Sequence, residues 1–373
     1  MIDDALNSND DYNDESEKEH FFKIVHAFKS YRGYSQSLVM KRLSYIETLP
    51  SHQQNALKAY KSTLEKVLNC IDVNHKVIEL ITEDVEKLFE NVQHANEPRE
   101  KPHKINVADV EKVQVTLKQI YRDWSQDGVM ERIQAYQPIL DELESRFPLD
   151  SSKRREDINV LVPGAGLGRL AFEIAKLGFS CQGNEFSLFM LFASNFILNR
   201  CAGVDLYRIF PWTQSCDNNL SSEDMIRPVA FPDVDPSILY KMNSGKTRFT
   251  MVAGDFLEVY TTNDEWDCIA TCFFIDCASN IFTFIEHIYR ILKPGGLWIN
   301  LGPLQYHFSS STDEFSIEPS YEDVKTIIKS IGFQLQSEST KRPTFYCLNR
   351  TSMLKQHYDS VFFTCTKPSD TDR

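Results

Sequence analysis

Apolar residues recur every three or four positions from residue 21 to about residue 147, which is the spacing of helices that bury one face. The pattern predicts a helical N-terminal region over residues 21–150, including a helix at residues 107–124 and a proline-containing linker near residues 94–103. Ser51 and Gln54 have the spacing of a capping box, and Pro138 should break or kink the last helix. Residues 1–20 carry eight acids and few large apolar side chains, so we expect a disordered acidic tail there.

The pattern changes at Ile158, where short apolar runs begin to alternate with helical segments. This alternation predicts an α/β domain over residues 151–373, built on a Rossmann-like, doubly wound parallel sheet. A stretch at about 201–246 has four prolines and weak periodicity, and we interpret it as a long insertion. The first strand ends just before Gly164, and further strands are expected at residues 179–184, 249–253, 266–275, 297–301, 333–339 and 361–366.

A glycine-rich turn, V-P-G-A-G-L-G-R, joins the first strand to the next helix. Gly164, Gly166 and Gly168 would let the backbone approach a ligand closely. The dinucleotide pattern G-x-G-x-x-G fails because its sixth position is Arg169. The spacing therefore disfavours an NAD-linked dehydrogenase and is typical of the first loop of S-adenosylmethionine (AdoMet)-dependent methyltransferases. A tight turn in another kind of α/β sheet is the alternative.

Composition and charge limit the possible functions. A net charge of −13 and the lack of a basic run argue against nucleic acid as the main partner. The N-terminus is acidic and no long apolar run suggests a membrane span, so we expect a cytoplasmic protein, with a nuclear location left open. The nine cysteines form no C-x-x-C pair, and Cys268 and Cys272 lie about 13 Å apart on the expected strand, too far to share a zinc ion. Reduced thiols and no metal site are expected.

Acids stand where the second and third strands end, which is the edge at which ligands of such sheets bind. Glu185 lies twenty-one residues after Gly164, a position from which an acid binds the ribose hydroxyls of a nucleoside. A surface acid at the start of the next helix is the alternative. Asp255 could accept from an adenine amine while Phe256 stacks on the base, although a simple helix N-cap explains Asp255 equally well.

Two residues near the next strand ends are candidates for catalysis. Asp276 closes the run C-I-A-T-C-F-F-I-D and could accept a hydrogen bond from the methyl acceptor; a helix cap is its other reading, but Ser279 or Asn280 could equally fill that role. His307 follows the strand that comes after L-K-P-G-G, and it is either structural or catalytic.

Several segments together closely resemble the carnosine N-methyltransferase family, over roughly residues 105–367. They are Q-I-Y-R-D-W, the glycine turn, C-Q-G-N-E, A-G-D-F, W-D-C-I-A-T-C-F-F-I-D and L-K-P-G-G-L-W-I-N-L-G-P-L-Q-Y-H-F. The resemblance implies a class I methyltransferase sheet behind a helical N-terminal region. It also accounts for the insertion as a feature of the family.

The resemblance further implies an activity and a set of site residues. The activity is AdoMet-dependent methylation of an imidazole nitrogen in a histidine-containing dipeptide, of the carnosine to anserine type. Asp276 and His307 would be catalytic and would hold the substrate together with Tyr346 and Tyr358. The implied AdoMet contacts are Gln119, Arg122, Gly164, Gly166, Glu185, Asp255, Phe256 and Cys272.

Other activities remain open at this stage. The acceptor could be another histidine-containing peptide or a protein, and an inactive adaptor that keeps the cofactor site as a relic is a different class of function. A homodimer is also left open.

Overall fold

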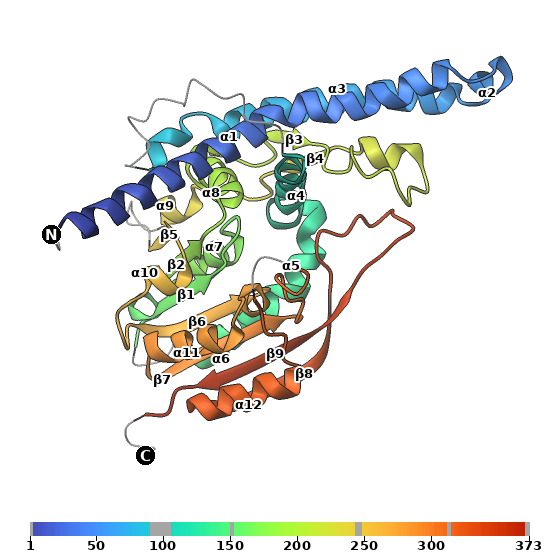
Figure 1. Ribbon diagram of the computed structural model, residues 1–373. Coiled ribbons are helices and arrows are strands. Elements are labelled where there is room, and N and C mark those ends of the chain that lie inside the picture. The colour runs from blue at the N-terminus through green and yellow to red at the C-terminus, as the bar shows by residue number, and fades with distance from the viewer. Residues whose placement is uncertain (1–2, 90–105, 150–152, 243–247, 312–314, 370–373) are drawn as a thin grey trace. The chain divides into compact units, whose positions relative to one another are not determined.

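The computed structural model describes residues 3–89, 106–149, 153–242, 248–311 and 315–369, with side chains from residue 16 onward (Figure 1). The chain forms two compact units. Unit 1 comprises residues 1–126, 188–235 and 349–355, and unit 2 comprises residues 127–187, 236–348 and 356–373. The units therefore divide the chain differently from the boundary expected at residue 150. The reason is that the helices of residues 129–146 pack on strands of the sheet, whereas most of the insertion packs on the N-terminal helices.

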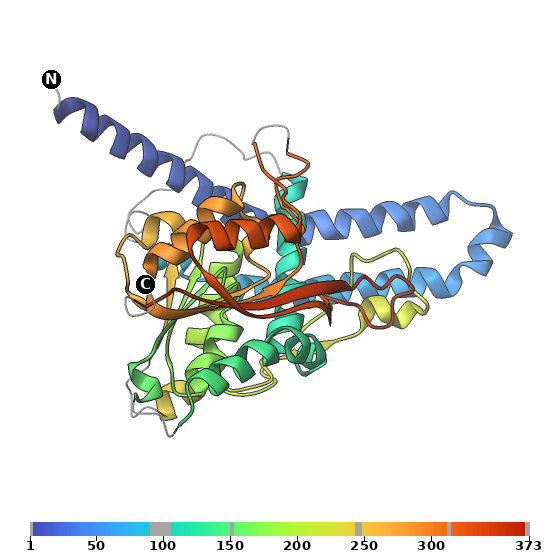
Figure 2. The same cartoon turned by 90° about the horizontal axis from the view of Figure 1, so that it is seen from below.

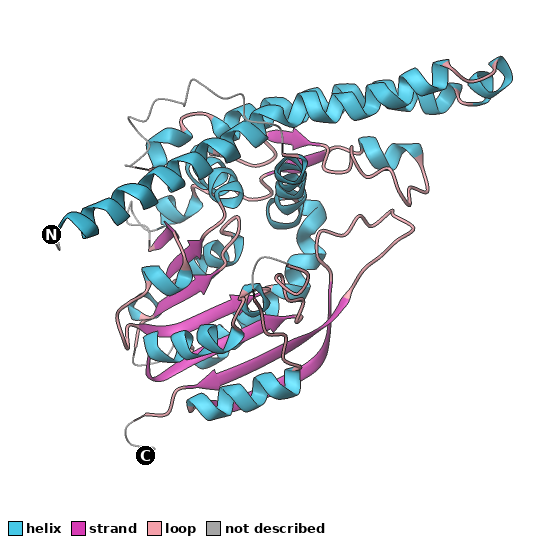
Figure 3. Ribbon diagram, viewed as in Figure 1, coloured by secondary structure: helices cyan, strands magenta, loops and turns pink. Residues whose placement is uncertain are grey.

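Unit 2 is built on one seven-stranded sheet with the order β5-β2-β1-β6-β7-β9-β8, drawn in magenta in Figure 3. All neighbouring strands pair in parallel except that β9 is antiparallel to both β7 and β8. This is the predicted doubly wound α/β sheet. The strands are β1 (Asn159–Pro163), β2 (Ser180–Glu185), β5 (Phe249–Ala253), β6 (Trp266–Cys272), β7 (Leu292–Gly302), β8 (Gln334–Thr344) and β9 (Tyr358–Thr366).

The core of unit 2 follows from the register of these strands. Leu161 pairs with Ile269, Ile269 with Trp298 and Trp298 with Cys365, so these four buried side chains share one face of the sheet. Apolar stripes of α11 (Ile281–Ile291) and α12 (Tyr321–Ile331) cover this face, and α6 lies on the other side (Figure 2). The other helices of unit 2 are α5 (Val129–Ala135), α6 (Gln137–Arg146), η3 (Arg155–Asp157), α7 (Arg169–Lys176), α9 (Ile238–Met242), α10 (Phe256–Val259) and η6 (Ile275–Cys277).

Three predicted boundaries in unit 2 can be compared with the structure. The break at Pro138 is confirmed, since α5 ends at Ala135 and α6 starts with proline in its first turn. Strand β6 ends at Cys272 instead of Ile275, because Phe273 adopts a left-handed backbone with φ of 53° that cannot continue a strand. Strand β7 starts at Leu292 instead of Leu297, with an irregular register against β6 next to the glycines that follow Pro294.

Unit 1 is mainly helical, and helices α1 (Asp3–Glu47) and α3 (Lys58–Thr82) run side by side (Figure 1). Helix α1 extends back to Asp3, where the sequence had suggested a disordered tail; a helix already nucleated by the buried residues after Phe21 propagates at little cost. Helix α4 (Val107–Trp124) has the predicted bounds. The capping box at Ser51 is absent, because Pro50 is the N-cap of α2 (Ser51–Ala56) and makes no side-chain bond. The expected linker at residues 94–103 lies outside the described residues.

The insertion is not one long loop. It contains β3 (Tyr207–Ile209) paired antiparallel with β4 (Val229–Phe231), and η5 (Ser222–Ile226) lies between them. Buried Asn74 of α3 anchors this segment: its amide nitrogen donates to Tyr31 Oη at 2.9 Å and to the Phe210 carbonyl at 3.0 Å, and its oxygen accepts from the Phe210 N–H at 2.7 Å. Asn74 and Phe210 are 136 residues apart, so local sequence patterns could not predict this contact.

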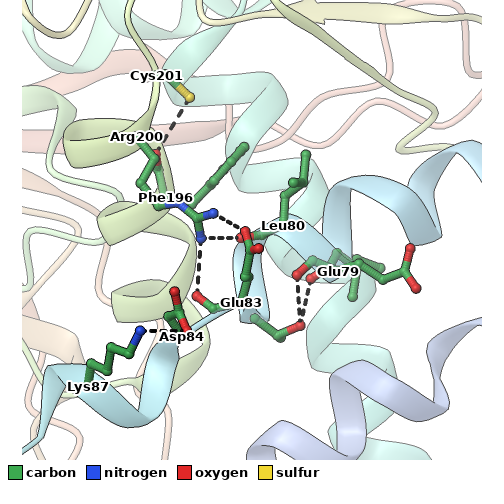
Figure 4. Close-up of polar contacts among 10 residues, drawn as sticks. Glu79, Leu80, Glu83, Asp84, Lys87, Phe196, Arg200 and Cys201 are labelled. Carbon is green, nitrogen blue, oxygen red and sulfur yellow. Dashed lines mark hydrogen bonds and ion pairs between the residues drawn. The ribbon is translucent and has the colours of Figure 1, made fainter.

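Arg200 closes the C-terminal end of α3 (Figure 4). It follows α8 (Leu188–Asn195) at the end of the π-helical turn η4 (Phe196–Arg200), and its Nη1 donates to the carbonyls of Leu80 at 2.9 Å and Glu83 at 3.1 Å. Its Nη2 pairs with the Glu83 carboxylate. Carbonyls at the end of a helix lack intrahelical donors and favour a cation, so Arg200 joins two segments of unit 1 that are distant in sequence. Two short 3-10 helices complete the list of elements: η1 (Val85–Leu88) follows α3, and η2 (Gln126–Gly128) follows α4.

Several expectations from composition concern the whole chain. None of the nine cysteines forms a disulfide, which agrees with the expected reduced thiols. Within the described ranges, no helix is long and apolar enough to cross a membrane. In the same residues, no group of three or more His, Cys, Asp or Glu side chains is arranged to hold a metal ion.

A capping box at the start of α12 generates a stability test. Ser320 Oγ accepts from the Asp323 N–H at 3.3 Å, while Asp323 Oδ2 accepts from the Ser320 N–H at 3.1 Å. We expect Ser320→Ala to lower the free energy of unfolding by about 1 kcal/mol, a fall in Tm of about 2 °C by calorimetry. Ser330→Ala within the same helix is the matched control and should change Tm by less than about 1 °C. Equal effects of the two variants would contradict the cap.

Candidate active site

The candidate site lies where the carboxyl ends of the parallel strands of unit 2 meet. Strand β1 is the central point at which the chain order reverses, with β2 on one side and β6 on the other. A crevice outside the strand ends at such a switch point is where open α/β sheets bind ligands. The segments that follow β1, β2, β5, β6 and β7 all leave the sheet at this edge.

The glycine turn after β1 is shaped by steric limits. Gly164, Gly166 and Gly168 have φ of 65°, 55° and 78°, values that side chains rarely allow. A Cβ on Gly164 would lie 2.4 Å from the ring of Phe274, whereas one on Gly166 would meet no atom within 4 Å. The space beside Gly166 is therefore open, which leaves room for a ligand against the backbone.

Glu185 ends β2, as predicted, and its carboxylate is fixed by main-chain donors. Oε2 accepts from the Gly166 N–H at 2.7 Å, and Oε1 accepts from the N–H groups of Phe186 at 2.9 Å and Ser187 at 2.8 Å. Burial raises the pKa of the carboxyl above its ordinary value, and these three donors oppose the rise. A carboxylate has about four acceptor positions, so one on Oε2 stays available for a ribose hydroxyl. Binding both ribose hydroxyls would require one of the main-chain bonds to be given up.

Asp255 and Phe256 follow β5, and the structure gives both a structural role. Asp255 is the N-cap of α10, with Oδ1 accepting from the Leu257 N–H at 2.7 Å. Phe256 is buried and packs edge-on against Phe274, Phe284 and His287. The N-cap reading of Asp255 is thus observed, and its second oxygen can still accept from a base. Contacts of Asp255 and Phe256 with adenine stay predictions from the family.

Asp276 lies four residues beyond the end of β6, in the short helix η6, and is buried. Its Oδ2 accepts from the Gln305 N–H at 2.8 Å, and its carbonyl accepts from the His307 N–H at 3.2 Å. Burial raises the pKa of its carboxyl, while the Gln305 N–H and nearby His307 oppose the rise. The helix-cap alternative is excluded, because Asn280 caps α11 by accepting from Phe282 and Thr283.

His307 lies close to Asp276 on the loop after β7, as predicted. Its Nε2 is 3.8 Å from the Sγ of Cys277, whose thiol also contacts the Phe273 carbonyl at 3.7 Å. Burial and the neighbouring carboxylates Asp276 and Glu185 raise the pKa of Cys277 well above its usual range, so it stays a thiol at neutral pH. The pattern of the sequence did not single out Cys277.

Two further residues join the predicted substrate residues, and sequence reasoning missed both. Gln305 connects Asp276 to Tyr358: its N–H binds the aspartate, and its Oε1 accepts from Tyr358 Oη at 2.5 Å. Phe273 lies between the two tyrosines, with its ring centroid 5.1 Å from that of Tyr346 and 6.2 Å from that of Tyr358. Phe273 lies in the F-F-I-D segment and Gln305 in the P-L-Q-Y-H segment. The sequence of these segments does not indicate that Phe273 contacts the tyrosines or that Gln305 binds Asp276 and Tyr358.

The remaining predicted residues are Cys272, next to Phe273 in unit 2, and Gln119 and Arg122, in unit 1. Cys272 ends β6 half-buried, with its Sγ 3.9 Å from the Ala135 carbonyl. Gln119 and Arg122 are buried on α4 in unit 1, and Arg122 Nη1 is 3.4 Å from Gln119 Oε1. Their part in cofactor binding stays a prediction.

The sheet, the glycine turn and the acid-ended strand β2 define a class I AdoMet-dependent methyltransferase. A family model described as carnosine N-methyltransferase matches residues 99–369. The chain belongs to the carnosine N-methyltransferase family.

Curated relatives agree with this assignment, and each is named carnosine N-methyltransferase. The protein from Rattus norvegicus is 46% identical over 94% of this chain and 87% of the relative. The Drosophila melanogaster protein, carnosine N-methyltransferase unmet, is 44% identical over 95% of this chain and 81% of the relative. The Schizosaccharomyces pombe protein is 37% identical over 94% of this chain and 96% of the relative.

Among solved structures, a Haemonchus contortus phosphoethanolamine N-methyltransferase 2 in complex with S-adenosyl-L-methionine aligns with a TM-score of 0.41. Its identity is 14%, over 71% of this chain and 59% of that chain. The class assignment rests on the family and the strand arrangement, not on this distant likeness.

The residues of unit 2 fit AdoMet by two observations. The open space at Gly166 admits a ligand against the turn, and Glu185 keeps one acceptor position beside it. We expect Glu185→Gln to raise the AdoMet Kd about tenfold or more in calorimetry, because the amide loses the charge and turns an NH2 group toward a main-chain N–H.

Asp267→Asn is the matched control for that variant. Asp267 stands at the start of β6, where it pairs with Lys153 at 2.6 Å and Lys293 at 2.8 Å. Its substitution should leave the AdoMet Kd within about twofold of the wild type. Wild-type affinity in Glu185→Gln would remove Glu185 from the cofactor site.

Proposed function

We propose that this chain methylates an imidazole nitrogen of a histidine-containing dipeptide, converting carnosine to anserine with AdoMet as methyl donor. The observation that carries the proposal is the hydrogen-bonded cluster of Asp276, Gln305 and Tyr358, with His307 beside it, at the ligand-binding edge of the sheet. Family membership supports the same acceptor. The proposal includes a cytoplasmic location, with the nucleus and a homodimer as further possibilities to test.

The glycine turn and Glu185 would hold the cofactor, with Asp255 at its base end. Bound AdoMet supplies an electrophilic methyl group on a sulfonium. No acid or base need act on that group, so the task of the protein is to place a neutral imidazole ring in line with it. Holding two reactants in the right geometry is worth on the order of 7–11 kcal/mol of the barrier.

Asp276 can set the state of the acceptor ring. If its carboxylate accepts the N–H of one ring nitrogen, the other nitrogen carries the free lone pair and is the nucleophile. As the ring nitrogen takes the methyl group, the sulfur–methyl bond breaks and the thioether S-adenosylhomocysteine would leave. The ring becomes positively charged, and a fixed carboxylate in a buried site stabilises that charge strongly until the product gives up its N–H proton. The Gln305 N–H holds the carboxylate in place, so little reorganisation is needed during the reaction.

His307, Tyr358 and Tyr346 would hold the rest of the substrate. Tyr358 is half-buried and its hydroxyl is committed to Gln305, while His307 and Tyr346 are exposed. An aromatic wall made of Phe273 and the two tyrosines suits the flat face of an imidazole ring. These groups orient the ring and none of them needs to gain or lose a proton.

The acceptor can be tested by mass spectrometry of reactions that contain AdoMet and one candidate acceptor. Carnosine should gain the mass of one methyl group, and tandem spectra should place it on the imidazole ring. In a parallel reaction, a cell extract depleted of small molecules replaces carnosine as the source of acceptors. Methylation of a protein there, with carnosine unchanged, would replace the dipeptide by a protein acceptor, and no AdoMet binding at all would support an inactive adaptor.

Asp276→Asn separates chemistry from cofactor binding. The amide keeps the shape and the bond to Gln305 but carries no charge, so we expect carnosine turnover to fall by about a thousandfold or more. The AdoMet Kd should stay within about twofold. Turnover near that of the wild type would remove Asp276 from the catalytic role.

The same variant should be more stable than the wild type at neutral pH. The folded-state pKa of Asp276 is raised, so its contribution to stability is full below the unfolded pKa and is lost as pH rises through the folded value. At pH 7 the charged group therefore costs stability, and Asp276→Asn should raise Tm by about 2 °C, on the order of 1 kcal/mol. The gain should shrink when the pH is lowered toward 4. A gain that grows at low pH would contradict the sign of the shift.

A further inference from the structure

Glu131 is a buried carboxylate outside the predicted site. It lies in the first turn of α5 with 1% of its surface exposed. Its Oε2 accepts from the Cys347 N–H at 2.7 Å, and its Oε1 accepts from the Leu348 N–H at 2.9 Å. Gln134, one turn later on the same helix face, accepts from the Phe345 N–H at 3.3 Å. Three of the four main-chain N–H groups of residues 345–348 therefore end on side chains of α5.

The backbone of this loop is shaped for such a carboxylate. Strand β8 and its pairing with β9 end at Thr344, so the N–H groups that follow lie beyond the sheet. Cys347 has φ of 51°, a left-handed conformation that points consecutive N–H groups toward one side. Consecutive N–H groups in this arrangement form a concave site for an anion, and Glu131 fills it.

The loop carries Tyr346, one residue before the N–H groups that Glu131 binds. The ring of Tyr346 packs against Phe273, which itself follows β6 in a left-handed conformation and contacts Tyr358. Glu131 is thus connected to the aromatic wall of the site through one backbone segment. Displacement of that segment would move Tyr346 away from Phe273.

We propose that Glu131 is a positioning residue for the methyl acceptor: it holds residues 345–348 so that Tyr346 stays on Phe273 at the site. This inference rests on the proposed function for the role of Tyr346. Glu131 touches neither reactant in this scheme. It acts on acceptor binding and leaves the cofactor side unchanged.

Glu131→Gln is the informative variant, since a glutamine of equal size can accept one N–H but turns its NH2 group against the other. Hydrogen–deuterium exchange should show faster exchange of the amides of residues 345–348, with the strands of the sheet unchanged. Asp141→Asn is the matched control on α6, because that carboxylate is exposed and accepts from Gln137 of its own helix. It should leave exchange at residues 345–348 unchanged.

A double-mutant cycle with Tyr346→Ala separates positioning from a general structural role. Glu131→Gln should lower kcat/KM for carnosine about tenfold in the wild-type background, mainly through KM, and less than about twofold in the Tyr346→Ala background. The AdoMet Kd should not change. An equal loss in both backgrounds, or unchanged amide exchange, would overturn the inference while wild-type methylation of carnosine leaves the proposed function intact.

Two further outcomes are distinguished by separate measurements. A wild type that binds AdoMet but does not methylate carnosine would overturn the proposed function, and with it the role assigned to Tyr346. If Glu131→Gln fails to fold, Gln134→Ala removes only the acceptor of the Phe345 N–H. That variant should show a smaller effect in the same direction, about threefold in KM, and no effect on KM would count against the inference.

Discussion

The parallel pairing of β1, β2, β5, β6 and β7 is the constraint on which the site depends. It brings five strand ends to one edge, so that residues separated by more than 140 positions, such as Gly164 and His307, belong to one region of unit 2. The glycine turn, Glu185, Asp255, Asp276 and His307 are each a short local feature. Only the common strand direction makes them parts of one site.

Three buried carboxylates in unit 2 are stabilised in the same way. Glu185, Asp276 and Glu131 each accept from main-chain N–H groups of a loop at a strand end. Main-chain donors cannot change rotamer, so they fix both the carboxylate and the loop that supplies them. The loops at this edge are therefore ordered by acids, and the raised pKa values of Glu185 and Asp276 show that burial of these charges is only partly compensated.

Sequence patterns predicted what depends on periodicity and local spacing. The parallel strands, the bounds of α4 and the break before Pro138 follow from side-chain alternation and short-range chemistry. The resemblance to the family assigned Asp276 and His307, which lie in its motifs, and Tyr358, which lies outside them, to the substrate. Gln305 and Glu131 could not be predicted from local patterns. The Gln305 N–H donates to a carboxylate 29 residues away, and Glu131 accepts from N–H groups more than 200 residues away. The regular structure within the insertion could not be predicted for the same reason, because the residue that binds it, Asn74, lies far away on α3.

The division of the chain into units has a consequence for folding during synthesis. Unit 1 is assembled from residues 1–126, 188–235 and 349–355, so its last segment is made only after most of unit 2. Apolar side chains of α1 and α4 that pack on α8 wait for residue 188 and beyond before they are covered. A chain cut after unit 1's first segment would keep this apolar surface uncovered. Neither unit is therefore one continuous stretch of the chain, and the nascent chain has to keep α1 and α4 from aggregating until α8 has been made.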